Sequence, residues 1–433
     1  MKLFSLLLAF VLFPFAFYAQ SYVPVDTSNL VTRKLISKEY LKNTKLFNTQ
    51  VKSEFEGSER TNILNHFEKV HKQFNEDLLN GSYLFDQRFI DMIDRIVAEL
   101  KSKNKDIPEN IHFYVSKELS LNASSLGDTY FVINLGAFYY LDNEEELASI
   151  IAHEIGHLML RHSYKSIQQH ALSVKEEAKK QAKVVKQEKS NKSEKAWNKL
   201  KQILYEESNF NRKQEYESDS IGYVLYKNAN FNKANYISTL KLMDLYDSIK
   251  PMGLKNETYK RMFNLPNQSY KEEWLKREDF KSYDYSKYHD KIDEDSVSAH
   301  PKTKERIANI KRLFPELTEE VEPDRGTASF DSLQSLAKAS QPYCLDYQEE
   351  YGYGVYICLL RLQNDENNAF YRHWLGEFFS KIYDARKAYT LNRYLERIDP
   401  KEQSESYQQF LSFMWNLNLN EIKNIKEYYK KDA

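Results

Sequence analysis

The sequence contains little cysteine, almost no net charge and only one long apolar run. Its 433 residues include 62 Lys and Arg against 63 Asp and Glu, which gives a net charge of −1 and no reason to expect a nucleic-acid partner. The two cysteines, Cys344 and Cys358, can pair in an oxidising compartment or remain free and buried as small hydrophobes. Apart from the N-terminal run, no stretch is apolar enough to cross a bilayer.

The apolar run, Leu3–Tyr18, follows Met1 and Lys2 and precedes a candidate cleavage position at Ala19. This layout is typical of a secretory signal peptide. The run is short for a membrane span, so we expect residues 1–19 to be a cleaved signal peptide, with an uncleaved N-terminal anchor as the alternative. No cysteine stands directly after the run, so a lipid anchor is not indicated. The protein is therefore expected to be exported, and to be periplasmic in a bacterium.

The strongest chemical signal is the run His153-Glu154-Ile155-Gly156-His157. On a helix, this H-E-x-x-H pattern places two imidazoles one turn apart with a carboxylate beside them. Zinc binds neutral imidazole readily and keeps one coordination position open for water in catalytic sites. The pattern therefore predicts one zinc ion per chain, with His153 and His157 as ligands and Glu154 taking a proton from zinc-bound water.

The surrounding sequence predicts the helix independently of the motif. Asp142 and Asn143 can cap its start, and three successive glutamates suit its positive N-terminal end. Apolar residues then recur at helical spacing on a face that excludes both histidines. The members of this apolar stripe are Leu147, Ile150, Ile151, Ile155 and Leu158.

A third zinc ligand is expected from residues 211–222, which also have a helical pattern. Glu215 and Asp219 lie four residues apart on one face, whereas Glu217 points elsewhere, so only one of the two glutamates can face the zinc. We expect Glu215 to bind the metal and Asp219 to accept the outer N–H of a ligand histidine. The alternative is an acidic helix face in contact with solvent, which is common in a chain with 29% charged residues.

Together these residues resemble the family of HtpX and CAAX prenyl endopeptidases, which are gluzincin zinc metalloproteases, and in particular its soluble periplasmic branch. The family shows H-E-[LI]-G-H with a further histidine five residues on, here His162, and then S-R-x-x-E-x-E-A-D-x-x-G, matched except at Asn211 and Ser218. Its H-P-x-T-x-x-R-I motif is matched at residues 300–307. The resemblance spans residues 122–312.

The resemblance implies an α+β fold that is mostly helical, with a zincin-like metalloprotease core around a small mixed sheet. Asn122 and Ala123, followed by Thr129–Asn134, resemble the segment that the family uses as an edge strand along its active-site cleft. We therefore expect substrate to lie extended against Thr129–Asn134.

The resemblance also marks His300 and Arg306 as candidate catalytic residues. In the periplasmic branch, the histidine at the position of His300 can reach the zinc. Because a fourth protein ligand would displace the catalytic water, His300 is expected to hold the resting enzyme in an inhibited state. Two alternatives remain open: His300 stabilises the oxyanion of the transition state, or it only caps the helix leading to Arg306.

The chain is expected to divide into an N-terminal extension, a zinc metallopeptidase domain, a linker and a helical C-terminal domain. The corresponding ranges are residues 20–57, 58–315, 316–340 and 341–433, with helices at Asn62–Leu79 and Asp86–Lys101 and a strand at Ile111–Val115. The C-terminal domain is either tetratricopeptide-like or an ordinary helical appendage. The residues at tetratricopeptide spacing are Leu375, Gly376, Phe379, Ala388 and Pro400.

A basic helical insert is expected at about residues 165–205. Between positions 175 and 201 it carries ten Lys against four Glu, with no Gly or Pro, which predicts a long helix or a helical hairpin. This insert is either a lid or a contact with an anionic membrane surface, or else a solvated helical face.

These features predict an exported zinc-dependent endopeptidase that cleaves misfolded or unassembled envelope proteins. Its substrates would be polypeptides, and its C-terminal helices would bind protein partners. Glu154 would accept a proton from the attacking water and pass a proton to the leaving amine. The competing hypothesis is a protease-like chaperone or assembly adaptor that retains the site but rarely cleaves.

Overall fold

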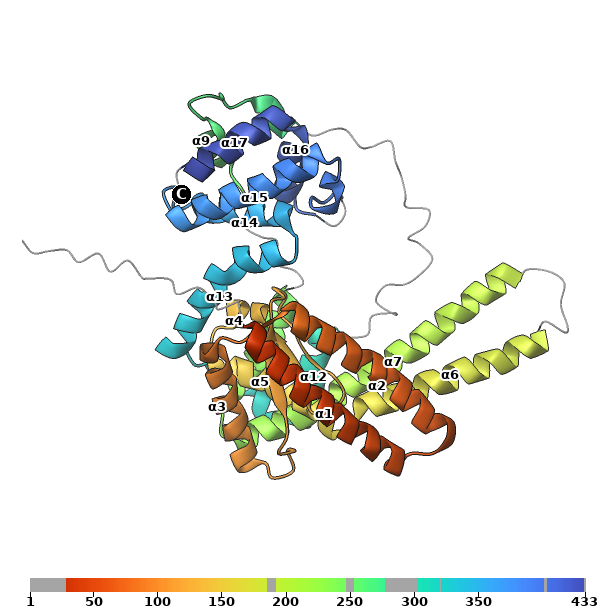
Figure 1. Ribbon diagram of the computed structural model, residues 1–433. Coiled ribbons are helices and arrows are strands. Elements are labelled where there is room, and N and C mark those ends of the chain that lie inside the picture. The colour runs from red at the N-terminus through yellow and green to blue at the C-terminus, as the bar shows by residue number, and fades with distance from the viewer. Residues whose placement is uncertain are drawn as a thin grey trace, which may run out of the picture.

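A computed structural model describes residues 29–184, 192–246, 253–276, 302–319, 321–400 and 403–431. The described chain is mostly helical with one small mixed sheet, which confirms the predicted α+β class (Figure 1). The strands are β1 (Tyr83–Leu84), β2 (His112–Ser116), β3 (Ala123–Ser125) and β4 (Tyr130–Asn134). The helices are α1 (Leu30–Glu54), α2 (Gly57–Asn80), α3 (Gln87–Lys103), α4 (Leu135–Tyr140), α5 (Glu144–Met159), α6 (His162–Val184), α7 (Lys192–Asn228), α8 (Lys233–Tyr246), α9 (Asn256–Phe263), α12 (Thr303–Leu313), α13 (Ala328–Tyr347), α14 (Tyr351–Leu362), α15 (Ala369–Lys387), α16 (Glu405–Asn416) and α17 (Leu419–Lys431), with 3-10 helices η1 (Glu272–Leu275), η2 (Pro315–Thr318) and η3 (Leu391–Arg393).

The four strands lie in the order β1-β2-β4-β3. β2 runs parallel to β4, and β3 pairs antiparallel with the other side of β4, with Ser124 opposite Val132. The prediction that Thr129–Asn134 forms the edge strand is therefore wrong, because β3 covers that side of β4. Among the described strands, the edge next to α5, which carries the H-E-x-x-H motif, belongs to β3.

Alternation of side chains along β4 explains why helices cover both faces of the sheet. Phe131 and Ile133 are fully buried in the main core, which contains the apolar faces of α3 and α5. Tyr130 and Val132 point the other way and pack with residues of α1 and α2. Successive side chains of a strand point to opposite faces, so this short strand contributes to two cores.

The N-terminal extension contains a helix that the sequence analysis did not predict. α1 is 25 residues long and packs beside α2 (Figure 1). Its periodicity is hidden because few of its residues are buried, and one of these is Ser37, while apolar residues such as Val31 and Leu35 are exposed. Packing of residues such as Tyr40 and Val51 against neighbouring elements stabilises α1 more than its intrinsic helix propensity does.

The C-terminal helices surround a second core. Figure 1 shows α14, α15, α16 and α17 gathered at one end of the molecule, with α13 between them and the rest. α13 begins at Ala328, inside the segment expected to be a linker, and its first half packs into the main core. Residues 254–275 pack with the C-terminal helices, although the expected domain boundaries place them in the peptidase domain. Cys344 and Cys358 are both free and buried, in different cores.

The expected basic insert covers most of α6 and the first part of α7, which extend away from the core (Figure 1). Residues 185–191 of the insert lie outside the described residues. None of the helices within the described ranges combines the length and the apolar character needed to span a bilayer.

Candidate metal centre

Local sequence determines where the H-E-x-x-H helix begins. The Asn143 side chain accepts a hydrogen bond of 2.8 Å from the Glu146 amide, and the Glu146 carboxylate accepts one of 2.8 Å from the Asp142 amide. The first bond satisfies an amide that the helix itself leaves unpaired and confirms the expected cap at Asn143, and the second ties the preceding residue to the first turn. From this start, α5 carries His153 and His157 to its last two turns.

α5 and α7 approach closely because each helix has a glycine at the crossing. A Cβ atom on Gly222 would lie 2.9 Å from the Cα of His153, and one on Gly156 would lie 3.1 Å from the backbone oxygen of Ser218. No larger side chain fits between the two backbones at these points. The close crossing brings Glu215 and Asp219 of α7 next to the two histidines of α5.

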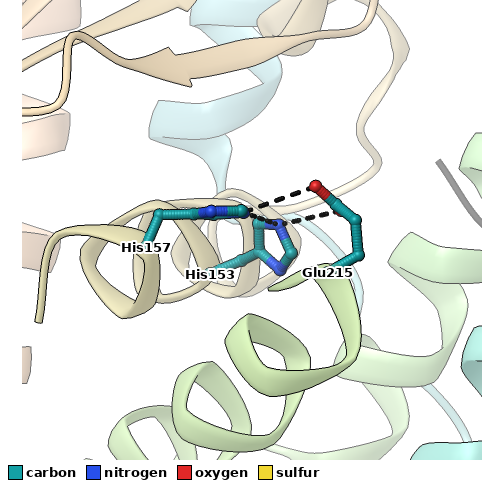
Figure 2. A group of neighbouring side chains, drawn as sticks. All are labelled: His153, His157 and Glu215. Atoms are coloured by element: carbon teal, nitrogen blue, oxygen red, sulfur yellow. Dashed lines mark hydrogen bonds and ion pairs between the residues drawn. The ribbon is translucent and has the colours of Figure 1, made fainter. Parts of the chain in front are cut away.

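His153, His157 and Glu215 converge on one point. Figure 2 shows the two imidazoles of α5 and the carboxylate of α7 pointing toward one another. The Nε2 atoms of the histidines are 3.1 Å apart; Nε2 of His153 lies 3.5 Å from Oε2 of Glu215, and Nε2 of His157 lies 3.5 Å from Oε1. With one oxygen taken from Glu215, the three ligand atoms lie within 4.8 Å of one another. A tetrahedral zinc site, with metal–ligand distances of about 2.0–2.1 Å, has edges of about 3.3 Å between ligand atoms. The three side chains carry the nitrogen and oxygen donors that zinc binds, and they lie close enough together to form a group able to hold a metal ion.

A buried network holds His153 from behind. Its Nδ1 lies 3.0 Å from Oδ1 of Asp219, the contact expected from the sequence. Arg306 donates to both oxygens of Asp219, at 2.6 and 2.9 Å, and also lies 3.6 Å from Glu215. Burial alone would raise the pKa of Asp219, but the Arg306 guanidinium and the His153 ring outweigh burial and lower this pKa to about 2. Asp219 is therefore expected to be ionised at neutral pH.

Glu154 lies beside the three converging side chains and next to the sheet. Burial, the largest influence, raises the pKa of its carboxyl group, and the charge of Glu215 adds to that effect. The His153 ring and a hydrogen bond donated by the backbone amide of Ser125 act in the opposite direction. The Ser125 contact places the edge strand β3 directly beside Glu154.

These residues open into a cleft of about 910 Å³. One part of its lining is the segment that leads into β3, at residues 120–123, and another is α5. Leu240, Met243 and Tyr246 of α8 contribute apolar surface, whereas charged side chains come from α7 and α12. The cleft therefore combines a strand edge with a lining of mixed polarity.

Sequence reasoning placed several of these residues and missed others. Arg306 was a candidate catalytic residue; it lies behind the ligands and contacts Asp219. His300 lies outside the described residues. Glu217 is not in the converging group, yet it contacts His162, a neighbour of His157 for which the motif indicated no role. No spacing rule identifies that contact, because it depends on a chain reversal after α5.

Comparison with known proteins places these motifs in a family. The sequence profile of Peptidase family M48 matches residues 86–313. A predicted beta-barrel assembly-enhancing protease of Vibrio cholerae serotype O1 is 30% identical over 79 residues, which are 18% of this chain and 16% of that protein. The beta-barrel assembly-enhancing protease of Yersinia pestis is 29% identical over 86 residues, 20% of this chain and 18% of that protein. The matched segment thus spans less than a fifth of either relative.

Proposed function

Because the chain belongs to peptidase family M48, whose members are zinc metalloproteases, we propose that it is an exported zinc endopeptidase that cleaves misfolded or unassembled envelope proteins. The observation that carries this proposal is the convergence of two imidazole nitrogens and a carboxylate beside Glu154 in a cleft. Polypeptide substrates follow from the peptidase family. Export rests on the N-terminal run expected to be a signal peptide, and the envelope rests on the names of the two relatives.

His153, His157 and Glu215 would hold one zinc ion, which when bound supplies the positive charge that polarises the substrate carbonyl and the attacking water. Glu154 accepts the proton that this water loses and then delivers a proton to the leaving amine nitrogen. Asp219 accepts the Nδ1–H of His153, which leaves Nε2 free to face the metal. Arg306 keeps Asp219 charged and oriented.

The substrate backbone would pair with the edge of β3. An extended peptide that adds a strand to this edge is recognised through its main-chain groups, so its side chains are constrained only weakly. Ser125 of β3 donates to Glu154, so a peptide on this edge passes beside the base. The mixed lining of the cleft, apolar at Leu240 and charged near Glu305, accommodates side chains of several kinds. Both features favour loose sequence preference, which suits unfolded substrates.

A cleavage assay with casein as the unfolded substrate tests the proposal. The zinc-loaded wild-type protein is expected to degrade casein, and Glu154→Gln is expected to abolish degradation while zinc stays at one ion per chain. Loss of a general base that acts in both proton transfers costs about 10²–10⁴-fold in rate. Glu144→Gln, the same change in the first turn of α5, serves as the matched control and should retain full activity.

Two outcomes would contradict the proposal. If wild type and Glu154→Gln both protect casein from aggregation and neither cleaves it, the protein is a chaperone or adaptor that retains the site. If Glu154→Gln cleaves casein as fast as wild type, another group accepts the proton and the assignment of the base is wrong.

A further inference from the structure

The outer nitrogen of His157 faces a second histidine. Nδ1 of His157 lies 3.0 Å from Nδ1 of His162, and the two rings meet at an interplanar angle of 78°. Nε2 of His162 lies 3.2 Å from an oxygen of Glu217. These two contacts form a chain from His157 through His162 to Glu217. The chain starts at Nδ1 of His157, whereas Nε2 of the same ring faces the other ligand atoms.

The chemistry of imidazole fixes the direction of these hydrogen bonds. If Nε2 of His157 binds a metal, its only proton is on Nδ1, and this N–H needs an acceptor. The neighbouring Nδ1 of His162 is such an acceptor only when the proton of His162 is on Nε2. The Glu217 carboxylate can only accept, so it selects the tautomer of His162 with the proton on Nε2. One set of proton positions therefore satisfies all three side chains.

His162 is held in place for this contact. His162 is only 2% exposed, and its backbone oxygen accepts a hydrogen bond of 3.1 Å from the Gln214 side chain of α7. The chain reversal between α5 and α6 depends on Arg161, whose φ of 53° lies in the left-handed region. Glu217 is different: its side chain is 36% exposed and lies 3.7 Å from Lys213.

We propose that His162 and Glu217 form a positioning relay that orients His157 and fixes its tautomer for binding zinc. The relay has two hydrogen bonds, from His157 to His162 and from His162 to Glu217. It rests on the proposed function, because it assumes a metal at His153, His157 and Glu215. Neither residue touches the substrate, so both are positioning residues.

The relay makes the two zinc histidines unequal. His153 donates directly to Asp219, a buried carboxylate that Arg306 holds. His157 donates to a neutral ring, and a carboxylate is reached only one side chain further out. The orientation of His157 therefore depends on a partly exposed residue, whereas that of His153 depends on a buried ion pair.

Zinc affinity of the full-length protein tests the relay without any cleavage assay. Metal-free protein is titrated with zinc in competition with a chelator. His162→Leu removes the acceptor and should weaken zinc binding about 10- to 100-fold, the usual cost of losing a group that orients a metal ligand. His162→Asn keeps an amide oxygen attached to Cγ, where Nδ1 stands in histidine, and should restore affinity to within about threefold of wild type.

Substitutions at Glu217 and Ser218 test the relay with less risk of unfolding the protein. Glu217→Ala alters a partly exposed side chain and should weaken zinc binding by less than about tenfold, because water can replace the outer acceptor; Glu217→Gln keeps the acceptor and should bind as wild type does. The hydroxyl of Ser218 lies 3.1 Å from the same Nδ1 of His162 but belongs to no step of the relay. Ser218→Ala, the matched control at a buried position, should leave zinc affinity unchanged.

A spectroscopic readout separates positioning from loss of fold. In the cobalt-substituted protein, the Nδ1 protons of His153 and His157 should give two exchangeable, paramagnetically shifted proton resonances. In Glu217→Ala and His162→Leu, one of the two should exchange faster with solvent, and the other should not change.

The relay is overturned if His162→Leu, folded by circular dichroism, binds zinc within twofold of wild type. It is also overturned if His162→Asn and His162→Leu weaken binding equally, or if Glu217→Ala leaves both affinity and proton exchange unchanged. Failure of the metal site on which the relay rests is distinct, because wild-type protein would then bind no zinc in the same titration. Failure of the proposed peptidase activity alone would leave zinc binding intact and would appear only in the casein assay.

Discussion

The metal ligands are brought together by the close contact between α5 and α7. The substitution Gly222→Ala perturbs this contact by adding a single methyl group. The new Cβ would lie 2.9 Å from the Cα, and 3.0 Å from the backbone nitrogen, of His153. Both neighbours are backbone atoms of a zinc-ligand residue, so no side chain can rotate away. The two helices must move apart.

The size of this movement follows from the contact distances. Carbon atoms in contact settle at about 3.5–4.0 Å, so the helices must separate by about 0.5–1 Å at Gly222. Inserting a methylene into a packed interface costs about 1–3 kcal/mol of folding free energy. Functional constellations tolerate displacements of only about 0.5 Å, and Glu215 moves with α7 while His153 moves with α5. We therefore expect zinc affinity to fall by at least about tenfold, or about 1.4 kcal/mol.

Zinc competition titration and urea unfolding measure the two effects, and a second glycine supplies the control. Gly376→Ala would place a Cβ 3.1 Å from the backbone of Tyr429, at a helix contact in the C-terminal core. It should lower stability without changing zinc affinity. If Gly222→Ala binds zinc as tightly as wild type, the ligands do not depend on the α5–α7 crossing and the reasoning is refuted.

Three further changes test other parts of the structure. Arg306→Met should destabilise the fold by about 3 kcal/mol in urea unfolding because it removes the positive charge that balances the buried Asp219 carboxylate, and adding Asp219→Leu should recover part of that loss; additive losses would refute the pairing. Burial lowers the pKa of Lys117 from 10.5 to about 8, so the unfolded chain binds more protons between these values and wild type should gain stability with rising pH. The stability of Lys117→Met relative to wild type should therefore fall from pH 7 to pH 10, and a constant difference would contradict the burial of this charge. Asn143→Ala should cost about 1 kcal/mol by removing the cap that accepts from Glu146, measured by thermal unfolding, and an unchanged melting temperature would refute the cap.

Local signals explain what could be predicted from the sequence. The helix α5 follows from its cap and its apolar stripe. Helical spacing places Asp219 on the same face as Glu215, where it can accept the outer N–H of a ligand histidine, here His153. The family predicted from the motifs and the α+β class are both confirmed. Each of these inferences needs only residues within a few turns of one another, or motifs in a fixed order.

Non-local pairing explains what could not be predicted. β3 has three residues, too few for any alternation to appear, and its place at the edge depends on which side of β4 it joins. The contact between His157 and His162 requires a chain reversal at Arg161, a residue type that rarely adopts positive φ. The packing of residues 254–275 against the C-terminal helices joins segments about a hundred residues apart in the chain.

The central claim is that His153, His157 and Glu215 together hold one zinc ion beside Glu154. Crystals of the zinc-loaded protein, with diffraction recorded on both sides of the zinc absorption edge, test it directly. We predict one anomalous peak per chain, about 2.0–2.1 Å from Nε2 of both histidines and about 2.0–2.2 Å from a carboxylate oxygen of Glu215. No peak between these three side chains, or a peak bound to Glu217 in place of Glu215, would contradict the account.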